Sequence, residues 1–320
     1  MSMTVFDLQN TNKQMTAEKI PATVTALGTF DGVHIGHAAL LREACTLASS
    51  LGSDVFPAVW TFFEPPFRGR VKYLTTLQEK LSLFARAGIR YVFLEEFSNV
   101  QMLPPKDFVS KILLAGCGVR GAVCGFNFRF GHSAMGTPAF LQKELANAHA
   151  PVLITQKVTQ GDEAVSSTRI RALLDAGDTE YAAQCLGRYY SVSLPVVHGK
   201  ELGRKIGIPT INQNFPLERQ TPLRGTYAST VSVDGVLYPG VTNVGIRPSI
   251  TENDSHTPNA ETHIIGYRGW LYDKSIRVYF RHRLRDEQVF PSLDAMKAQI
   301  ARDIDASNAS FHEHKELCYG

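Results

Sequence analysis

Two histidines three residues apart follow a glycine-rich turn and could do chemistry on a phosphate. The segment GTFDGVHIGH, residues 28–37, lies between an apolar run that predicts a strand and a pattern that predicts a helix. Glycines let the backbone approach a phosphate, and a helix N-terminus offers free N–H groups to an anion. His34 and His37 share one face of the first helical turn, where imidazoles suit charge developing on a phosphate during displacement. The alternative is a tight turn with two solvated histidines.

Two further segments offer groups for a flat ring and for a second anion. GFNFRFG, residues 125–131, follows a predicted strand and places an amide among alternating aromatic residues, which suits a flat heteroaromatic ring. SSTRIR, residues 166–171, begins a predicted helix, so hydroxyls, backbone N–H groups and arginines converge on one anion position. Taken alone, the first is more typical of a β-bulge with core phenylalanines, and the second of an N-cap with a basic first turn. Their recurrence in one predicted sheet favours a shared pocket.

A glycine-spaced basic loop lies in the second half of the chain. VHGKELGRKIGIPTIN, residues 197–212, carries Lys200, Arg204 and Lys205 between its glycines. Such a loop can wrap a polyphosphate, although the P-loop pattern GxxxxGK[ST] is absent. Taken alone, the segment is equally typical of a glycine-rich surface hairpin.

Three oxygen-bearing side chains in this half are candidates for metal binding and base catalysis. Thr210 and Asn212 alternate along an extended segment, so we expect their oxygens to face one side, as a pair for a hard cation assisted by nucleotide phosphates. Glu261 begins the apolar strand ETHIIG, where a carboxylate can act as general base toward a substrate hydroxyl. A glutamate in such a place is more often simply solvated.

The elements that would position the first set of residues alternate between strand and helix. Apolar runs predict strands at 22–27, 55–62, 91–94, 119–124 and 151–155, and helical patterns lie at 38–51, 77–87, 106–115 and 138–149. This alternation favours an α/β fold with a doubly wound parallel sheet. In such a sheet ligands bind at the carboxyl ends of the strands, and the histidine and aromatic segments fall there.

The pattern changes after Val165. Two short helices are predicted at 168–176 and 178–186, and strands follow at 227–233, 236–241, 262–267 and 276–280. Asp234-Gly235 is a two-residue hairpin signal between the first two of these strands. A helix then begins after Ser292 as N-cap, and the tail after Ser307 is polar enough for disorder. We predict domains at 1–187 and 188–320, the second a small antiparallel β-barrel with a C-terminal helix.

Composition excludes several classes of protein. The 320 residues are 44% apolar and 20% charged, as in globular proteins, with no apolar run long enough to cross a membrane and no secretion signal. A formal net charge of +3 is too mild to indicate nucleic-acid binding. Five cysteines without CxxC spacing argue against a disulfide framework or structural zinc, so we expect a cytoplasmic protein without an obligate protein partner.

The first-half motifs together resemble a known family. GTFDGVHIGH is similar to the signature of the HxGH nucleotidyltransferases, and with GFNFRFG and SSTRIR it resembles the adenylyltransferase half of prokaryotic bifunctional riboflavin kinase/FAD synthetases. That family joins ATP and FMN into FAD and pyrophosphate with Mg²⁺. The resemblance implies catalytic roles for His34 and His37. It implies ATP binding by Gly28, Phe30, Asp31, Gly32, Ser167, Thr168 and Arg171, and flavin binding by Asn127, Phe130 and Phe62.

The second-half motifs resemble the kinase half of the same family in the same order. GRKIGIPTIN is similar to GRxxGxPTAN of riboflavin kinases, and AETHII, NVGIRPS and RLRDEQVF resemble further segments. The resemblance implies a six-stranded antiparallel barrel in which Glu261 activates the terminal ribityl hydroxyl of riboflavin. It implies Mg²⁺ binding by Thr210 and Asn212, and ATP binding by Gly203, Arg204, Gly207 and Thr210.

The resemblance therefore implies a bifunctional enzyme with riboflavin, FMN and ATP as substrates, which makes FMN in the C-terminal domain and FAD in the N-terminal one. TFFEPP stands where the family usually reads TFDPHP, and Tyr272-Asp273 stands where tyrosine-glycine is usual. Three alternatives stay open: a chain with one activity only, for which the loss of acidity at Phe63 favours the kinase; a silent flavin or nucleotide sensor; and an HxGH transferase for another acceptor. The catalytic candidates argue against the sensor, and the aromatic segment and kinase motifs against the other acceptor.

Overall fold

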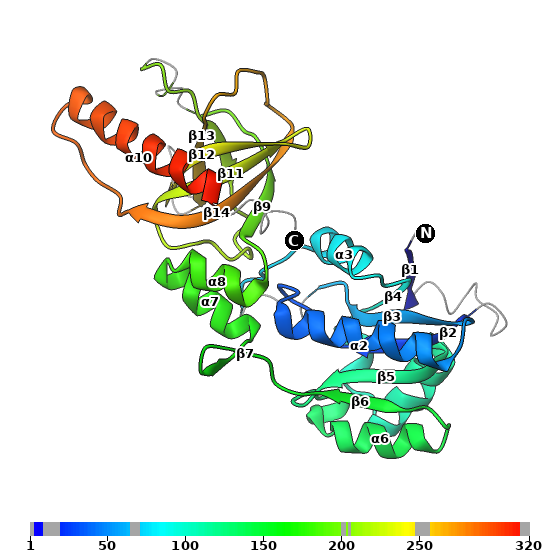
Figure 1. The fold of residues 1–320 in the computed structure, drawn as a ribbon. Coiled ribbons are helices and arrows are strands. Elements are labelled where there is room, and N and C mark those ends of the chain that lie inside the picture. Colours follow the sequence, from blue (N-terminus) through cyan, green and yellow to red (C-terminus); the bar gives the residue numbers. More distant parts are fainter. Residues whose placement is uncertain are drawn as a thin grey trace. The chain divides into compact units, whose positions relative to one another are not determined.

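The structure, a computed structural model, describes residues 3–8, 20–64, 71–199, 203, 206–246 and 257–313. Its chain forms two compact units that divide between Ser166 and Ser167, each with a sheet of its own (Figure 1). The helices α7 (Ser167–Ala176) and α8 (Thr179–Leu186) therefore belong to the second unit by their contacts. The predicted domain boundary after Gly187 stays a prediction.

The first unit contains a parallel sheet of six strands in the order β1-β4-β3-β2-β5-β6. These strands are β1 (Thr4–Asp7), β2 (Ala22–Leu27), β3 (Val55–Phe62), β4 (Tyr91–Glu95), β5 (Val119–Gly125) and β6 (Val152–Thr155). Five of them confirm the predicted strands. The sequence analysis missed β1, which pairs with β4 at the edge of the sheet. Its four residues alternate too briefly to give a signal of their own.

Helices cover both faces of this sheet and bury a separate core on each. On one face pack α2 (Ile35–Leu51) and α3 (Leu77–Arg86), with a core that includes Val24, Leu41 and Phe84. On the other face lie a π-helix η2 (Phe108–Gly116) and α6 (Pro138–Ala146), around Trp60 and Leu141. The remaining short elements are α4 (Phe97–Val100), α5 (Pro105–Asp107), η3 (His132–Ala134), β7 (Thr159–Gln160) and β8 (Glu163–Ala164).

The strand order reverses between β2 and β5. From β2 the chain adds β3 and β4 on one side, and it then returns to place β5 and β6 on the other. At such a switch point the loops that leave the two strands diverge and open a crevice at the carboxyl edge. The loop after β2 is the histidine segment, and the loop after β5 is GFNFRFG. The topology thus brings the two motifs to one edge of the sheet.

The second unit is an antiparallel sheet of six strands in the order β10-β13-β12-β11-β14-β9. Its strands are β9 (Tyr190–Pro195), β10 (Ile211–Asn214), β11 (Gly225–Val233), β12 (Val236–Ile246), β13 (Pro258–Ile264) and β14 (Ser275–Arg285). Beyond β9, the N–H of Val197 donates to the carbonyl of Asn212 at 2.8 Å, so the first and last strands of the order meet. The sheet curls into the predicted barrel.

The predicted turn at Asp234-Gly235 and the predicted N-cap Ser292 are both present in this unit. Val233 pairs with Val236 across the predicted turn, in which Asp234 and Gly235 both have positive φ, 48° and 84°. The N–H of Ala295 donates to Ser292 Oγ at 3.1 Å, which confirms the N-cap of the last helix.

The expectation of a disordered tail after Ser307 was wrong at its start. The helix α10 (Leu293–Glu313) continues past this residue, and Ser307 Oγ donates to the carbonyl of Gly240 on β12 at 2.6 Å. Ser307 and Ser310 are buried, and Ser310 accepts a hydrogen bond from the buried Arg281. Small hydroxyl side chains on the packed face of a helix look like a polar tail in the sequence.

Candidate active sites

The loop after β2 holds an unusual backbone. Phe30 and Val33 have φ of 51° and 39°, and Gly32 between them has φ of 81°. A positive φ is unfavourable for a bulky residue and above all for a β-branched one. Both side chains are held by burial, because Phe30 is completely inaccessible to solvent and packs edge-on against Phe84. Main-chain groups of this loop are therefore fixed in place before any ligand arrives.

Asp31 ties the same loop to the segment before α3. Its Oδ1 accepts hydrogen bonds from the backbone N–H groups of Leu74 at 2.9 Å and Thr75 at 3.2 Å. In return, the N–H of Gly32 donates to Thr75 Oγ1 at 2.9 Å. The carboxylate of Asp31 is 6% exposed, so its direct role in the structure is to hold the loop.

Lys80 adds a buried cation beside this anchor. The side chain is 4% exposed, and Nζ donates to the carbonyl of Phe62 at the end of β3, at 3.2 Å. Burial lowers the pKa of Lys80 to about 8, while the nearby negative charge of Asp31 acts in the opposite direction. The sequence analysis missed this residue, because a lysine in the amphipathic pattern of α3 looks like an ordinary exposed charge.

The two histidines lie together at the start of α2, as predicted. Their rings stack with centroids 3.6 Å apart and an angle of 15° between the planes. His34 is the N-cap of the helix, and its Nδ1 accepts the backbone N–H of His37 at 3.2 Å. Because Nδ1 is the acceptor, the proton of the neutral ring is on Nε2. His34 thus has a donor on the side of its ring away from the helix.

The aromatic candidates divide between surface and core. Asn127 is exposed after β5, whereas Phe62 and Phe130 are 7% and 6% exposed. The Phe130 ring lies between those of Phe108 and Phe128, at centroid distances of 5.0 and 5.5 Å, within one core cluster. The strand order places the ends of β3, β2 and β5 side by side, so Phe62, the histidines and Asn127 belong to one edge.

Ser167, Thr168 and Arg171 begin α7, the first helix of the second unit. Thr168 is exposed, while Ser167 and Arg171 are half-buried. Their predicted place beside the nucleotide of the first unit stays a prediction.

In the second unit, strand register brings the two key candidates together. Asn212 on β10 pairs directly with Glu261 on β13, which in turn pairs with Asn243 on β12. Directly paired residues in antiparallel strands have their side chains on the same face. A row of carboxylate and amide groups therefore crosses three strands, with Glu261 exposed at its centre.

Glycines allow the chain to pass close to this row. A Cβ at Gly203 would meet the carbonyl oxygen of Ile208, whose N–H donates to the Gly203 carbonyl at 2.8 Å. A Cβ at Gly199 would meet the amide of Asn212. Gly207 is exposed in the following turn with φ of 81°. Arg204, predicted to bind ATP, lies outside the described residues.

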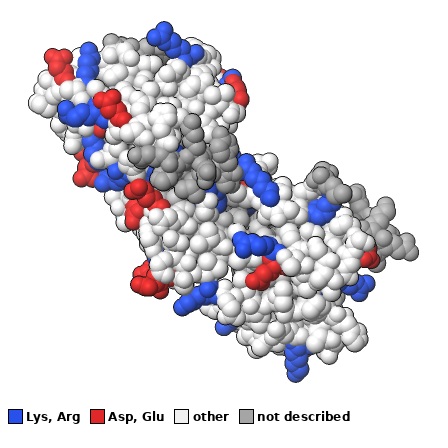
Figure 2. All heavy atoms as spheres, viewed as in Figure 1, with Lys and Arg blue, Asp and Glu red and all other residues white. Residues whose placement is uncertain are grey.

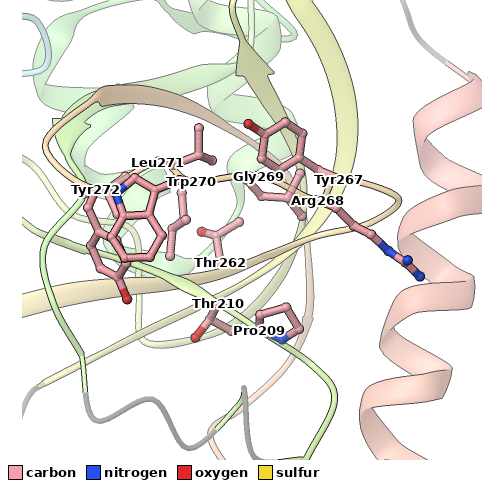
Figure 3. A pocket seen from close by; sticks show the side chains of 12 residues that line it. Pro209, Thr210, Thr262, Tyr267, Arg268, Gly269, Trp270, Leu271 and Tyr272 are labelled. Carbon is pink, nitrogen blue, oxygen red and sulfur yellow. The ribbon is translucent and has the colours of Figure 1, made fainter.

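A cavity of about 370 Å³ opens beside Thr210 (Figure 3). Its lining includes Thr262 and Ile264 from β13 and the aromatic residues Trp270 and Tyr272 from the turn before β14. Among the predicted kinase residues that the structure describes, Thr210 alone lines it. The sequence analysis missed Trp270, although a tryptophan between two predicted strands is a usable signal for a binding surface.

Both halves of the chain match known protein families. Residues 16–169 match the FAD synthetase family, and residues 186–311 match the riboflavin kinase family. A bifunctional riboflavin kinase/FMN adenylyltransferase of Pseudomonas fluorescens is 35% identical over 89% of this chain and 92% of its own length. A protein of the same name from Escherichia coli K12 is 36% identical over 88% of this chain and 90% of its own length.

A solved structure is also similar over nearly the whole chain. It is a Streptococcus pneumoniae protein described as a macrolide-efflux protein, with a TM-score of 0.82 at 25% identity over 95% of this chain and 98% of that one. Across the described residues of our chain, no helix has the length and apolar character that crossing a membrane requires.

Proposed function

This chain belongs to the bifunctional riboflavin kinase/FMN adenylyltransferase family, and from that premise we propose which residues carry each of its two reactions. The enzyme phosphorylates riboflavin to FMN with ATP, and it adenylylates FMN to FAD with release of pyrophosphate. The observation that carries the assignment of residues is that the histidine and aromatic segments meet at one edge of the parallel sheet, while Asn212 and Glu261 pair across two strands of the antiparallel sheet.

In adenylyl transfer, a phosphate oxygen of FMN attacks the α-phosphorus of ATP, and the bond to pyrophosphate breaks. This reaction needs alignment and charge neutralisation rather than a protein nucleophile. We assign the Nε2–H of His34 and the ring of His37 to the phosphates, where they stabilise charge in the transition state. The backbone of residues 28–32 approaches the nucleotide, while the buried side chains of Phe30 and Asp31 keep the loop in shape.

Flavin binding in this unit is assigned to the edge formed by β3 and β5. Asn127 is exposed there and offers an amide to the polar rim of the ring. Phe62 and Phe130 act from the core, as the packed base on which the exposed part of the segment rests. Ser167, Thr168 and Arg171 would hold the triphosphate.

In the kinase reaction, Glu261 accepts the proton of the terminal ribityl hydroxyl as the hydroxyl oxygen attacks the γ-phosphorus of ATP, and the bond from this phosphorus to ADP breaks. The exposed carboxylate has room for a substrate, and its pairing with Asn212 fixes its place. Gly203, Arg204, Gly207 and Thr210 would hold the nucleotide.

The oxygen atoms of the Thr210 and Asn212 side chains suit Mg²⁺. Mg²⁺ prefers oxygen ligands and commonly uses one or two protein groups together with substrate phosphates. Thr210 and Asn212 provide a hydroxyl and an amide oxygen, and we propose that they hold the metal. When bound, the metal neutralises charge on the phosphates.

We propose that the chain works in the cytoplasm on small molecules alone. The described cysteines are free thiols, and burial raises the pKa of Cys124 to about 12, so this thiol stays protonated and inert. On the face drawn in Figure 2, the described Lys and Arg side chains are interspersed with Asp and Glu. Such a surface gives little attraction to a polyanion.

The test is a time course of the purified chain with riboflavin, ATP and Mg²⁺, with the flavins separated by chromatography. We expect FMN first and FAD after it. FMN that accumulates without FAD, even when FMN is supplied directly, would favour the second candidate, a kinase alone. The observation behind this candidate is Phe63, which stands where the family usually has an acidic residue. If the chain forms neither FMN nor FAD, both assignments are overturned.

A further inference from the structure

Trp270 and Tyr272 line the cavity beside Thr210, and His198 stacks on the second of them. The rings of His198 and Tyr272 stack with centroids 4.0 Å apart and 13° between their planes. The ring of Trp270 meets that of Tyr272 edge-on at 4.7 Å, and both are labelled in Figure 3. The indole of Trp270 therefore contacts one ring of this stacked pair.

Trp270 is nevertheless 65% exposed, which is costly for so large an apolar side chain. The only other tryptophan, Trp60, is 2% exposed in the core of the first unit. A large apolar ring at the rim of a cavity, with polar groups such as Thr210 and Thr262 nearby, is typical of a small-molecule site. Part of the indole surface is thus available for a ligand.

We propose that Trp270 binds the adenine of ATP by stacking and so sets the affinity of the kinase site for the nucleotide. This inference rests on the proposed kinase function and adds a substrate-binding residue to it. Every base and every indole has a flat π surface, and stacking between them contributes appreciably to binding.

Thr210, which is proposed to bind both the nucleotide and the metal, lines this cavity, and this favours the nucleotide over the flavin as its ligand. Glu261 and Thr262 are neighbours on one strand, so their side chains point to opposite faces of the sheet. Thr262 lines the cavity, whereas Glu261, which must reach the ribityl hydroxyl, belongs to the other face. Thr210 lies at the cavity and Asn212, two residues on, pairs with Glu261. The phosphates of ATP would follow this path from the cavity to the reacting hydroxyl.

The first experiment uses the fluorescence of Trp270 itself. The variant Trp60→Phe leaves Trp270 as the sole tryptophan, and it is titrated with Mg-ADP in the absence of flavin, with excitation beyond the absorption of adenine. We expect saturable quenching by Mg-ADP, and no quenching by tripolyphosphate, which lacks the base. Quenching by riboflavin alone, with none by Mg-ADP, would place the flavin in the cavity and overturn the proposal.

The second experiment measures kinase kinetics. Trp270→Ala should raise the KM for ATP about tenfold with kcat nearly unchanged, as expected when one stacking contact is lost. Trp270→Phe should recover most of this loss. The KM for riboflavin, inhibition by tripolyphosphate and FAD formation from FMN should stay as in the parent chain. Leu217→Ala, which removes an exposed apolar residue of the same unit away from the cavity, serves as the matched control.

The outcomes separate the inference from the function on which it rests. An unchanged KM for ATP in Trp270→Ala would overturn the role of Trp270 while the kinase assignment stands. An equal rise in the KM values for ATP and riboflavin would also overturn it, because that pattern indicates general damage to the barrel. If the parent chain forms no FMN, the kinase function itself fails, whatever the fluorescence shows.

Discussion

The two units handle a nucleotide with opposite kinds of construction. In the first, the proposed catalytic histidines belong to a segment of ten consecutive positions, and its strained loop is held by buried side chains at the switch point of a parallel sheet. In the second, Asn212 and Glu261 are far apart in the sequence and meet only because two strands pair in one register. A contiguous loop can be recognised in the sequence as a motif, whereas the pairing of Asn212 with Glu261 exists only after the strands have folded together. A single substitution in either unit should therefore impair one of the two reactions more than the other.

The largest effect is expected when the proposed base, the carboxylate of Glu261, is removed from the second unit. Glu261→Gln keeps the size of the side chain but cannot accept the proton, so FMN formation should fall by about 10²- to 10⁴-fold. FAD formation from supplied FMN should be nearly unchanged, because Glu261 is not among the residues proposed for adenylyl transfer. Both rates are measured by flavin chromatography, with the exposed Glu218→Gln as control. Kinase turnover near that of the parent chain would show that another group takes the proton.

A substitution in the histidine segment after β2 should have the reverse effect and lower FAD formation rather than FMN formation. His37→Ala removes one ring of the stacked pair and should lower FAD formation by about 10²- to 10³-fold, because a group that stabilises transition-state charge is lost. FMN formation from riboflavin should stay near the parent rate. Equal loss of both activities would contradict the assignment of the two reactions to separate sets of residues.

A smaller effect is expected from the anchor of the loop. Asp31→Ala leaves the buried N–H groups of Leu74 and Thr75 without their acceptor, at a cost of about 1–3 kcal/mol for each unsatisfied group. We expect a lower free energy of unfolding for the first unit and weaker FAD formation, with the kinase unaffected. Denaturant titration measures the first, and the exposed Asp162→Ala is the control. Full stability with loss of FAD formation would instead mean that Asp31 acts on the ligand directly.

The smallest effect is the pH dependence of stability due to Lys80. Its pKa is about 8 in the folded chain and 10.5 for a freely exposed lysine, so between these values the unfolded chain binds more protons. The free energy of unfolding should therefore rise with pH across this window, by about 1 kcal/mol per pH unit from this group, with no such rise below pH 8. Lys80→Met should lack this rise. Parallel curves for the two proteins would show that Lys80 titrates normally.

Local signals in the sequence predicted most of the first unit and little of the geometry in the second. The apolar runs of β2 to β6 and the turn at Asp234-Gly235 depend on neighbouring residues, so composition and spacing identify them. The edge strand β1 carries too few residues for a pattern. The pairing of Asn212 with Glu261 depends on how distant strands align, which no short window of sequence contains.

The aromatic segment after β5 shows the same limit on a smaller scale. Its alternating phenylalanines predict one surface for a flat ring, but Phe126 is 49% exposed while Phe130 is in the core. Main-chain hydrogen bonds between Phe130 and Gly136 turn the segment inward at that point. A bridge between residues six positions apart, and not the alternation itself, decides which rings are available.

The hydrogen bond between Val197 and Asn212 closes the barrel, and Asn212 is also proposed to hold the metal. Any ligand that restrains Asn212 therefore also restrains the opening of the barrel, because the two processes share one residue. The amide proton of Val197 should exchange with solvent more slowly when Mg-ATP is bound, and proteases should cut the barrel less readily. Substrate supply would then influence the lifetime of the enzyme as well as its rate.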